Sequence, residues 1–380
     1  MNLKQLLEKH NISQRVLAKA IDVSPATVSN IAIKNEWPKT IDKSALLSKL
    51  SNFLLSKGVS KTHLDAVFTT AKQTPAKEEE AMLLRKQTLS QQAKKHFSLF
   101  ANPFSNDIQS ADELYLSPDV NYVRMAMYQA AKQGGFIAVC GESGAGKTTL
   151  RRDLLDRIQR EKLSIITIEP YVLATEDNDT KGKTLKAVHI AEAILHALAP
   201  LEKAKQSPEG RFRQIHKLLR ESSRAGNQHV LIIEEAHSLP MPTLKHLKRF
   251  FELEDGYKKL LSIILIGQNE LTLKLSEQNQ EVREVVQRCE IVTLDPLTQT
   301  GLTDYLNHRI KPTGRKLSDI IDESGITAIA SRLTATPVRK GQISRSLLYP
   351  LAVGNLITGA MNSAAELGVP TINADVVREV

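Results

Sequence analysis

The octapeptide GESGAGKT, residues 141–148, limits the possible folds of this chain more than any other stretch. It fits G-x-x-x-x-G-K-[ST], a loop whose N–H groups wrap phosphates while its lysine reaches the β- and γ-phosphates and its hydroxyl holds Mg²⁺. An apolar run, 136–140, precedes it as a buried strand would, and helix-compatible sequence follows. This context disfavours the alternative of a chance glycine-rich turn. We expect ATP and Mg²⁺ as ligands, with Thr148 on the metal, Lys147 also acting in catalysis, and the nucleotide held by Gly141, Glu142, Ser143, Gly144, Ala145, Gly146, Lys147, Thr148 and Thr149.

Further apolar runs alternate with helix-compatible sequence after this loop. They cover residues 163–168, 230–233, 261–266 and 291–294. Continuous apolar strands separated by helices predict a parallel sheet covered on both faces, and hence an α/β fold. From about residue 298 the pattern is helical. We expect an all-α domain at 1–70, a polar linker at 71–96, an α/β core at 97–297 and a helical domain at 298–380.

Composition indicates a soluble globular protein. Of its 380 residues 41% are hydrophobic and 24% are charged, and no apolar run approaches the roughly 18 residues of a membrane span. Two cysteines do not make a disulfide framework, and the N-terminus lacks the apolar core of a signal peptide. We expect a cytoplasmic protein without a membrane partner.

The positive charge is concentrated in the first hundred residues. They carry 16 lysines and arginines against 8 acidic residues, a net charge of +8, whereas the remaining 280 carry 35 against 34. A basic front end is typical of a nucleic-acid-binding segment, although a solubilising surface would look the same.

Residues 13–31 have the pattern of two short helices joined by a tight turn. Val16, Leu17, Ala20 and Ile21 lie at helical spacing, and Ser24 is suited to cap a second helix. The stretch resembles the repressor-type helix-turn-helix family, in which the second helix enters the major groove. A protein-interaction module of the same shape is the alternative. By position, the residues expected to contact DNA are Ser24, Thr27, Ser29, Asn30 and Lys34.

Two acids end the apolar run at 230–233. Glu234 would hold Mg²⁺ through its water shell, and Glu235 would act as the general base on the attacking water. Asp is commoner at the first position, so the extra methylene of Glu234 puts metal affinity and hydrolysis rate in question. The alternative is a pair of exposed acids capping a helix that begins at Ala236.

Several other polar residues are candidates for the ATP-binding and catalytic site. Gln268, after the apolar run at 261–266, would position water near the γ-phosphate, with Asn269 as the close alternative. Arg283 and Arg288 could reach the γ-phosphate of a neighbouring subunit, since arginine supplied in trans stabilises charge in phosphoryl transfer, but solvated surface arginines would look alike. Arg345 could contact nucleotide from the helical domain.

The order of phosphate loop, Glu-Glu strand, polar strand end, arginine pair and helical lid resembles the AAA+ ATPase family. Asn102-Pro103-Phe104, Leu116-Ser117-Pro118, Gly134-Gly135-Phe136 and Gly267-Gln268 resemble its ExeA-like branch, which includes transposition regulators of the TnsC and TniB types. A repressor-like helix-turn-helix ahead of such an ATPase is the arrangement of target-DNA activators of the phage Mu B type.

This resemblance implies an ATPase that assembles on double-stranded DNA with little sequence preference, as a homo-oligomeric helical filament or ring, and activates a transposase. Its setting would be a bacterial cell or phage-infected host. Basic residues of the ATPase usually line the DNA, and the candidates here are Lys181, Lys183 and Lys186. The alternatives are a nucleotide-switched transcription regulator, which would bind one operator, and a secretion ATPase of the ExeA kind.

Overall fold

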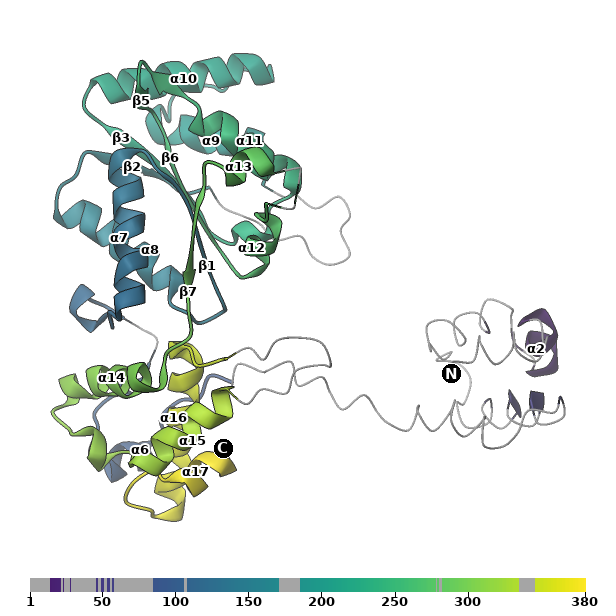
Figure 1. The fold of residues 1–380 in the computed structure, drawn as a ribbon, viewed down its shortest axis with the longest axis vertical. Coiled ribbons are helices and arrows are strands. Elements are labelled where there is room, and N and C mark those ends of the chain that lie inside the picture. The colour runs from purple at the N-terminus through teal and green to yellow at the C-terminus, as the bar shows by residue number, and fades with distance from the viewer. Residues whose placement is uncertain are drawn as a thin grey trace. The chain divides into compact units, whose positions relative to one another are not determined.

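The computed structural model forms two compact units, Met1–Glu80 and Ala81–Val380 (Figure 1). It describes residues 14–21, 23, 28, 46, 49–50, 53–54, 57, 85–105, 108–170, 185–277, 279, 282–334 and 346–380.

The first unit has a small apolar core of its own. Helix α2 (Gln14–Ile21) buries Leu17, Ala18 and Ile21, and the Val23 N–H donates to the Ala18 carbonyl at 3.0 Å where the chain leaves the helix. The other described residues buried in this unit are Val28, Leu46, Leu50 and Leu54. The predicted DNA contacts Ser24, Thr27, Ser29, Asn30 and Lys34 lie outside the described residues.

A five-stranded parallel sheet organises the second unit. Its strands are β1 (Phe136–Gly141), β2 (Ile165–Ile168), β3 (Gln228–Ile233), β6 (Ser262–Gly267) and β7 (Glu290–Leu294). They lie in the order β2-β3-β6-β1-β7 and all run the same way. Since β6 lies between β1 and β3, its carboxyl end separates the phosphate loop from the two acids.

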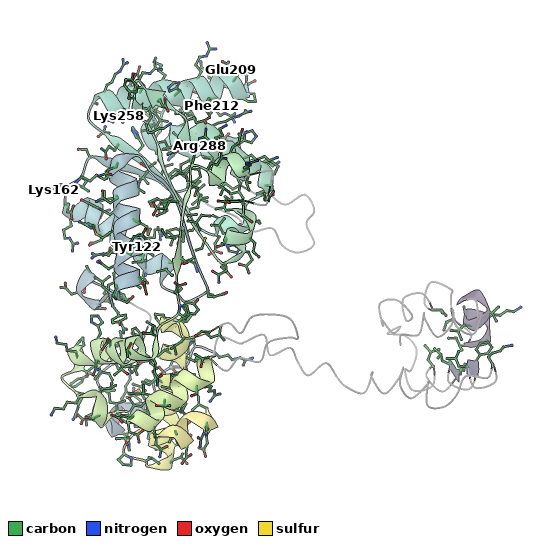
Figure 2. All side chains as sticks on the ribbon, viewed as in Figure 1. Tyr122, Lys162, Glu209, Phe212, Lys258 and Arg288 are labelled. Atoms are coloured by element: carbon green, nitrogen blue, oxygen red, sulfur yellow. The ribbon has the colours of Figure 1, made fainter. Side chains whose placement is uncertain are left out.

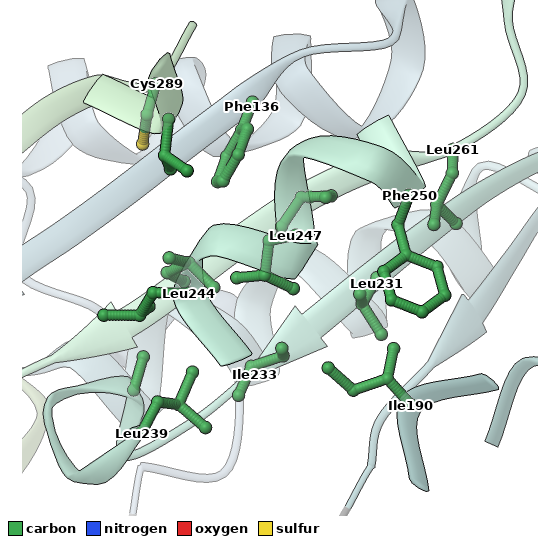
Figure 3. Packing of buried hydrophobic residues seen from close by; sticks show 14 of the residues in the cluster. Phe136, Ile190, Leu231, Ile233, Leu239, Leu244, Leu247, Phe250, Leu261 and Cys289 are labelled. Atoms are coloured by element: carbon green, nitrogen blue, oxygen red, sulfur yellow. The ribbon is translucent and has the colours of Figure 1, made fainter. Parts of the chain in front are cut away.

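Helices cover both faces of the sheet (Figure 1). On one face, Ile137 and Val139 pack against α7 (Pro118–Gln133) and α8 (Lys147–Arg160). On the other, Phe136, Ala138 and Cys140 join the cluster shown in Figure 3. That face is covered by α9 (Ala187–Leu198), α10 (Pro208–Arg224), α11 (Met241–Phe251), α12 (Glu270–Lys274) and α13 (Arg283–Val286). Each fully buried Leu or Ile stabilises the fold by about 1.5–3 kcal/mol, so two-sided burial explains the continuous apolar runs.

Local signals fix the ends of α7, which leads into the sheet. The Ser117 hydroxyl accepts from the Val120 N–H at 3.2 Å, and Pro118 occupies the first helical turn, where no N–H is needed. Gly134 ends the helix with φ at +87°, a left-handed conformation that glycine adopts without strain.

The C-terminal residues form a helical bundle with a separate core. Its helices are α14 (Gln299–Ile310), α15 (Glu323–Thr334), α16 (Pro350–Leu367) and α17 (Ala374–Glu379), with a single parallel bridge between Ile321 and Ile372. Other elements that the structure describes in this unit are the short turns η2 (Ala111–Glu113), η3 (Ala236–Ser238), η4 (Lys311–Thr313) and η5 (Leu317–Asp319) and the hairpin of β4 (Glu254–Asp255) and β5 (Lys258–Lys259).

Residues 85–104 belong to this bundle by packing, which differs from the linker expected at 71–96 and the core boundary at 97. Helix α6 (Gln91–His96) buries Ala93, and Phe97 and Phe104 lie in the same apolar cluster as the C-terminal helices. The Ser90 N–H donates to Asn362 Oδ1 at 2.9 Å, across 272 residues of sequence. The polar composition of this stretch indicated a linker, whereas a distant part of the chain packs against its helix at Ala93.

None of the helices that the structure describes is long and apolar enough to cross a membrane.

A buried histidine at the amino end of β3 makes the stability of the second unit dependent on pH. His229 is 2% exposed; its Nδ1 lies 2.9 Å from the Leu260 carbonyl and its Nε2 lies 2.8 Å from the Ser222 hydroxyl. A carbonyl only accepts, so Nδ1 carries the hydrogen and Nε2 accepts from Ser222. Burial lowers the pKa of His229, with nearby Lys258 acting in the same direction, so the folded state keeps the ring neutral.

We predict that the free energy of unfolding falls as the pH drops below about 6.5, the pKa of an unfolded histidine. Below that pH the histidine binds a proton in the unfolded chain but not in the folded chain. This difference lowers the free energy of unfolding by up to about 1.4 kcal/mol per pH unit. Denaturant unfolding at several pH values would measure the slope. His229→Asn should lose this part of the slope, whereas the exposed control His196→Ala should keep it; equal slopes in both variants would contradict the assignment.

Candidate active site

The loop after β1 has the backbone of a phosphate cradle. Gly144 and Gly146 have φ values of +81° and +99°, where a side chain would be strained. Helix α8 starts directly after Gly146 without a side-chain cap, so its first N–H groups are free to bind an anion. A Cβ on Gly146 would meet nothing within 4 Å, so this glycine borders open space.

The side chain of Lys147 is held against the phosphate loop by hydrogen bonds. Its ammonium donates to the carbonyls of Gly141 at 2.7 Å and Glu142 at 2.8 Å. Burial lowers the pKa of Lys147, and the negative charges of Glu235 and Glu142 act against that shift. A half-buried cation beside free helix N–H groups is suited to a polyphosphate, because charge-assisted hydrogen bonds strengthen out of bulk water.

The loop forms one wall of a cavity of about 840 Å³. Residues 143–149 line it together with other polar side chains. Its apolar lining is made by Ile108, Leu114, Tyr115, Val120, Leu297, Tyr305 and Leu351. A cavity lined by a phosphate-binding loop and by apolar and aromatic side chains fits a nucleoside triphosphate, whose base is flat and poorly hydrated.

Sequence reasoning missed the apolar lining because its residues come from two stretches that are far apart in the chain, 108–120 and 297–351. Tyr115 packs edge-on against Tyr305, with ring centroids 5.6 Å apart, and its hydroxyl donates to the Gly301 carbonyl at 3.3 Å. Burial raises the pKa of Tyr305 to about 12, so it remains a neutral phenol. The signal available was Leu114-Tyr115-Leu116-Ser117-Pro118, an ordered stretch that had no assigned ligand role.

The helical bundle also supplies a cation to the cavity. Arg309 on α14 lines it, with Nε donating to the Pro103 carbonyl at 2.8 Å and Nη2 to that of Ser105 at 2.5 Å. The expected lid arginine, Arg345, lies outside the described residues.

The bundle touches the phosphate loop directly. The Leu351 N–H at the start of α16 approaches the Gly144 carbonyl at 3.4 Å, and a Cβ on Gly144 would lie 2.4 Å from Leu351 Cβ. Glycine is therefore required here both by its φ and by this contact.

The two acids after β3 have different surroundings. Glu235 lines the cavity, and its backbone has φ at +50°, a conformation that costs a non-glycine residue on the order of 1–3 kcal/mol. Its side chain does not cap the turn η3 that follows, unlike in the helix-capping alternative. Glu234 is not among the described residues that line the cavity; its Oε2 lies 3.2 Å from Arg151 Nε, and Arg151 also pairs with Glu169 after β2.

Oxygen donors available near the loop suit Mg²⁺ bound together with nucleotide. Among the residues that the structure describes, no group of three or more His, Cys, Asp or Glu side chains is placed to hold a metal ion. Nucleotide-bound Mg²⁺ needs few protein ligands, because phosphates and water supply the rest. The Thr148 hydroxyl at the start of α8 and Glu234 after β3 are the residues that would hold it.

The carboxyl end of β6 brings Gln268 between the loop and the acids, where it lines the cavity. Asn269 is also engaged, since its Nδ2 donates to Glu142 Oε1 in the phosphate loop at 2.7 Å. Asn269 is therefore in direct contact with the phosphate loop, whereas the backbone N–H of Gln268 donates to His237.

The two arginines proposed to act on a neighbour lie away from the cavity of their own chain. Arg283 begins α13 and is exposed; Arg288 pairs with Glu252 at 3.2 Å and donates to the Glu284 carbonyl at 2.8 Å (Figure 2). Both precede β7. Because β7 runs parallel to β1, its amino end lies at the opposite end of the sheet from the phosphate loop.

Of the three lysines expected to line DNA, Lys186 is described and Lys181 and Lys183 are not. Lys186 precedes α9, and its backbone N–H donates to His189 Nδ1 at 3.2 Å.

Residues 130–275 match the family model of the AAA domain. This segment is similar to AAA domains. It contains the phosphate loop, both acids and the end of β6, so the chain is an ATPase with a parallel-sheet α/β AAA+ core. Residues 3–32 match a helix-turn-helix family, so a helix-turn-helix region precedes the AAA domain as the sequence predicted.

The chain is also similar to known proteins over wider ranges. It is 25% identical over 233 residues to general secretion pathway protein A of Aeromonas hydrophila, covering 57% of this chain and 37% of that relative. Cdc6p of Pyrobaculum aerophilum matches with a TM-score of 0.48 and 16% identity over 73% of this chain and 69% of that one. Drosophila ORC bound to DNA matches with a TM-score of 0.47 and 12% identity over 76% and 64%.

Proposed function

We propose that this protein is an ATP-dependent DNA-binding ATPase that assembles on double-stranded target DNA and activates a transposase. The observation that carries the proposal is the presence, in one chain, of a nucleotide cavity in an AAA domain and a helix-turn-helix region within a segment of net charge +8. Excess positive charge attracts any duplex through its phosphates, which favours binding with little sequence preference.

Assembly is supported by the position of the arginines. Arg283 and Arg288 lie at the far end of the sheet from the cavity of their own chain, so they would act on ATP only in a neighbouring subunit. An arginine supplied in trans stabilises the charge of phosphoryl transfer. ATP would then be hydrolysed efficiently only in the homo-oligomer, with Mg²⁺ held by Thr148 and Glu234.

The transposase is the most specific part of the proposal. It rests on the ExeA-like motifs, including Asn102-Pro103-Phe104 and Gly267-Gln268, combined with the order of the two regions. In target-DNA activators of the phage Mu B type, ATP promotes assembly on DNA and hydrolysis reverses it.

A secretion ATPase is the second candidate, because the relative from Aeromonas hydrophila is named a general secretion pathway protein. This chain spans about 37% of that relative's length. A secretion ATPase has no need of a helix-turn-helix region, so DNA binding separates the two candidates.

Electron microscopy of the protein with non-specific duplex and a slowly hydrolysed ATP analogue tests the proposal. We expect DNA-bound oligomers with the analogue, and none with Lys147→Ala or without nucleotide. Lack of such assemblies with the unmodified protein would refute the proposal. Tight binding to one sequence alone would indicate a nucleotide-switched transcription regulator.

A further inference from the structure

A histidine with no role so far lies against the proposed base. His237 belongs to η3, the single turn that follows the two acids. Its Nδ1 accepts a hydrogen bond from the Gln268 N–H at 3.3 Å, and its Nε2 lies 3.5 Å from Glu235 Oε2. The imidazole thus spans the gap between the end of β6 and the carboxylate after β3.

The hydrogen bond from the Gln268 N–H determines which ring nitrogen of His237 carries the hydrogen. A backbone N–H can only donate, so Nδ1 must have a free lone pair and the hydrogen must be on Nε2. The ring therefore presents a donor to Glu235 Oε2. The other carboxylate oxygen, Oε1, does not take part in this contact.

The turn that carries His237 is held on two sides. The Lys274 ammonium, from α12, donates to the His237 carbonyl and to that of Leu239 at 3.0 Å. Gly267 packs so closely that a Cβ there would lie 3.1 Å from the His237 backbone nitrogen and 2.9 Å from Leu271 Cδ2. The backbone of His237 is thus held in place, and its ring can orient the flexible side chain of Glu235.

The side chain of Glu235 needs a neighbour that holds it in one orientation. Its side chain is 61% exposed, and a glutamate in that setting samples many rotamers. A general base is efficient only when it lies within hydrogen-bond reach of the proton that it removes.

We propose that His237 is the positioning residue that orients Glu235 for ATP hydrolysis and connects its orientation to the strand end carrying Gln268. In the reaction, the water oxygen bonds to the γ-phosphorus and its proton passes to Glu235. The bond from that phosphorus to the β,γ-bridging oxygen breaks, and ADP leaves with the electron pair. His237 keeps its Nε2 hydrogen throughout. The inference rests on the ATPase activity and on Glu235 as base, and it does not require DNA or a transposase.

Glutamine and asparagine at position 237 separate positioning from a merely structural role. A glutamine amide nitrogen can occupy the place of Nε2 and donate to Glu235, whereas an asparagine amide reaches only the place of Nδ1. We expect kcat for ATP to fall about 10- to 100-fold in His237→Ala and His237→Asn, with KM within about twofold, and His237→Gln to recover most of kcat. The exposed His196→Ala, on α9, should behave as wild type.

Steady-state phosphate release and thermal unfolding of all four variants provide the test. Wild-type kcat in His237→Ala, or equal activity of the Asn and Gln variants, would overturn the proposal. If His237→Ala unfolds, the comparison of Asn with Gln still decides. His237→Ala should add little to the loss in Glu235→Gln, since residues that act as a unit are not additive. Assembly on DNA with a slowly hydrolysed analogue should persist in His237→Ala, so failure of the DNA proposal would be seen separately.

Discussion

Glu235→Gln is expected to lower kcat for ATP hydrolysis about 100- to 10,000-fold while leaving ATP binding nearly unchanged. The amide has the shape of the carboxylate but cannot accept the proton of the attacking water. The backbone at this position keeps its left-handed conformation in the variant, so the strain at φ of +50° is the same in both proteins. Phosphate release measures turnover, and titration with a fluorescent ATP analogue measures binding.

Glu209→Gln is the matched control for this variant. It makes the same chemical change at an exposed residue in the first turn of α10, where Glu209 pairs with Arg213 (Figure 2). It should hydrolyse ATP at the wild-type rate. Normal turnover in Glu235→Gln would mean that another group positions the water, with Glu234 as the first to examine.

Lys147→Ala should weaken ATP binding about 10- to 100-fold and with it remove ATP-dependent assembly on DNA. The ammonium is held against the phosphate loop by two carbonyls, and hydrogen bonds between charged groups contribute about 1.5–3 kcal/mol each. The fold should survive, because burial already disfavours the charged form of this lysine, as the direction of its pKa shift shows. Titration with a fluorescent ATP analogue, together with thermal unfolding, measures both effects.

Lys217→Ala, which removes an exposed lysine from α10, controls for the loss of one positive charge. Unchanged ATP affinity in Lys147→Ala would contradict the assignment of the loop at 141–148 as the phosphate site. Loss of ATP binding with DNA assembly intact would instead separate the helix-turn-helix region from the nucleotide switch.

The sheet and its order of motifs were predictable because their signals are local. The run at 136–140 and the glycines at 144 and 146 each reflect a requirement of the chain's own backbone: a strand buried on both faces, and φ values that only glycine adopts freely. The same holds for α7, where Ser117 and Gly134 fix both ends.

The relation between the two acids was not predictable. Both follow one strand, yet Glu235 faces the cavity while Glu234 pairs with Arg151. The left-handed backbone at Glu235 changes the direction of the chain after Glu234. The residue type of Glu235 does not predict this conformation. The position of Arg151 between Glu169 and Glu234 depends in turn on β2 and β3 being neighbours in the sheet.

The sequence by itself determined that this chain has an α/β nucleotide-binding core behind a helix-turn-helix region, since both rest on residues close together in the chain. Tertiary structure alone decided what surrounds the phosphate loop. Leu351 reaches Gly144 across 207 residues, Arg309 reaches Pro103 across 206, and His237 reaches Gln268 across 31. Such contacts depend on strand order and helix packing, which bring distant residues together for reasons of burial that no short stretch of sequence records.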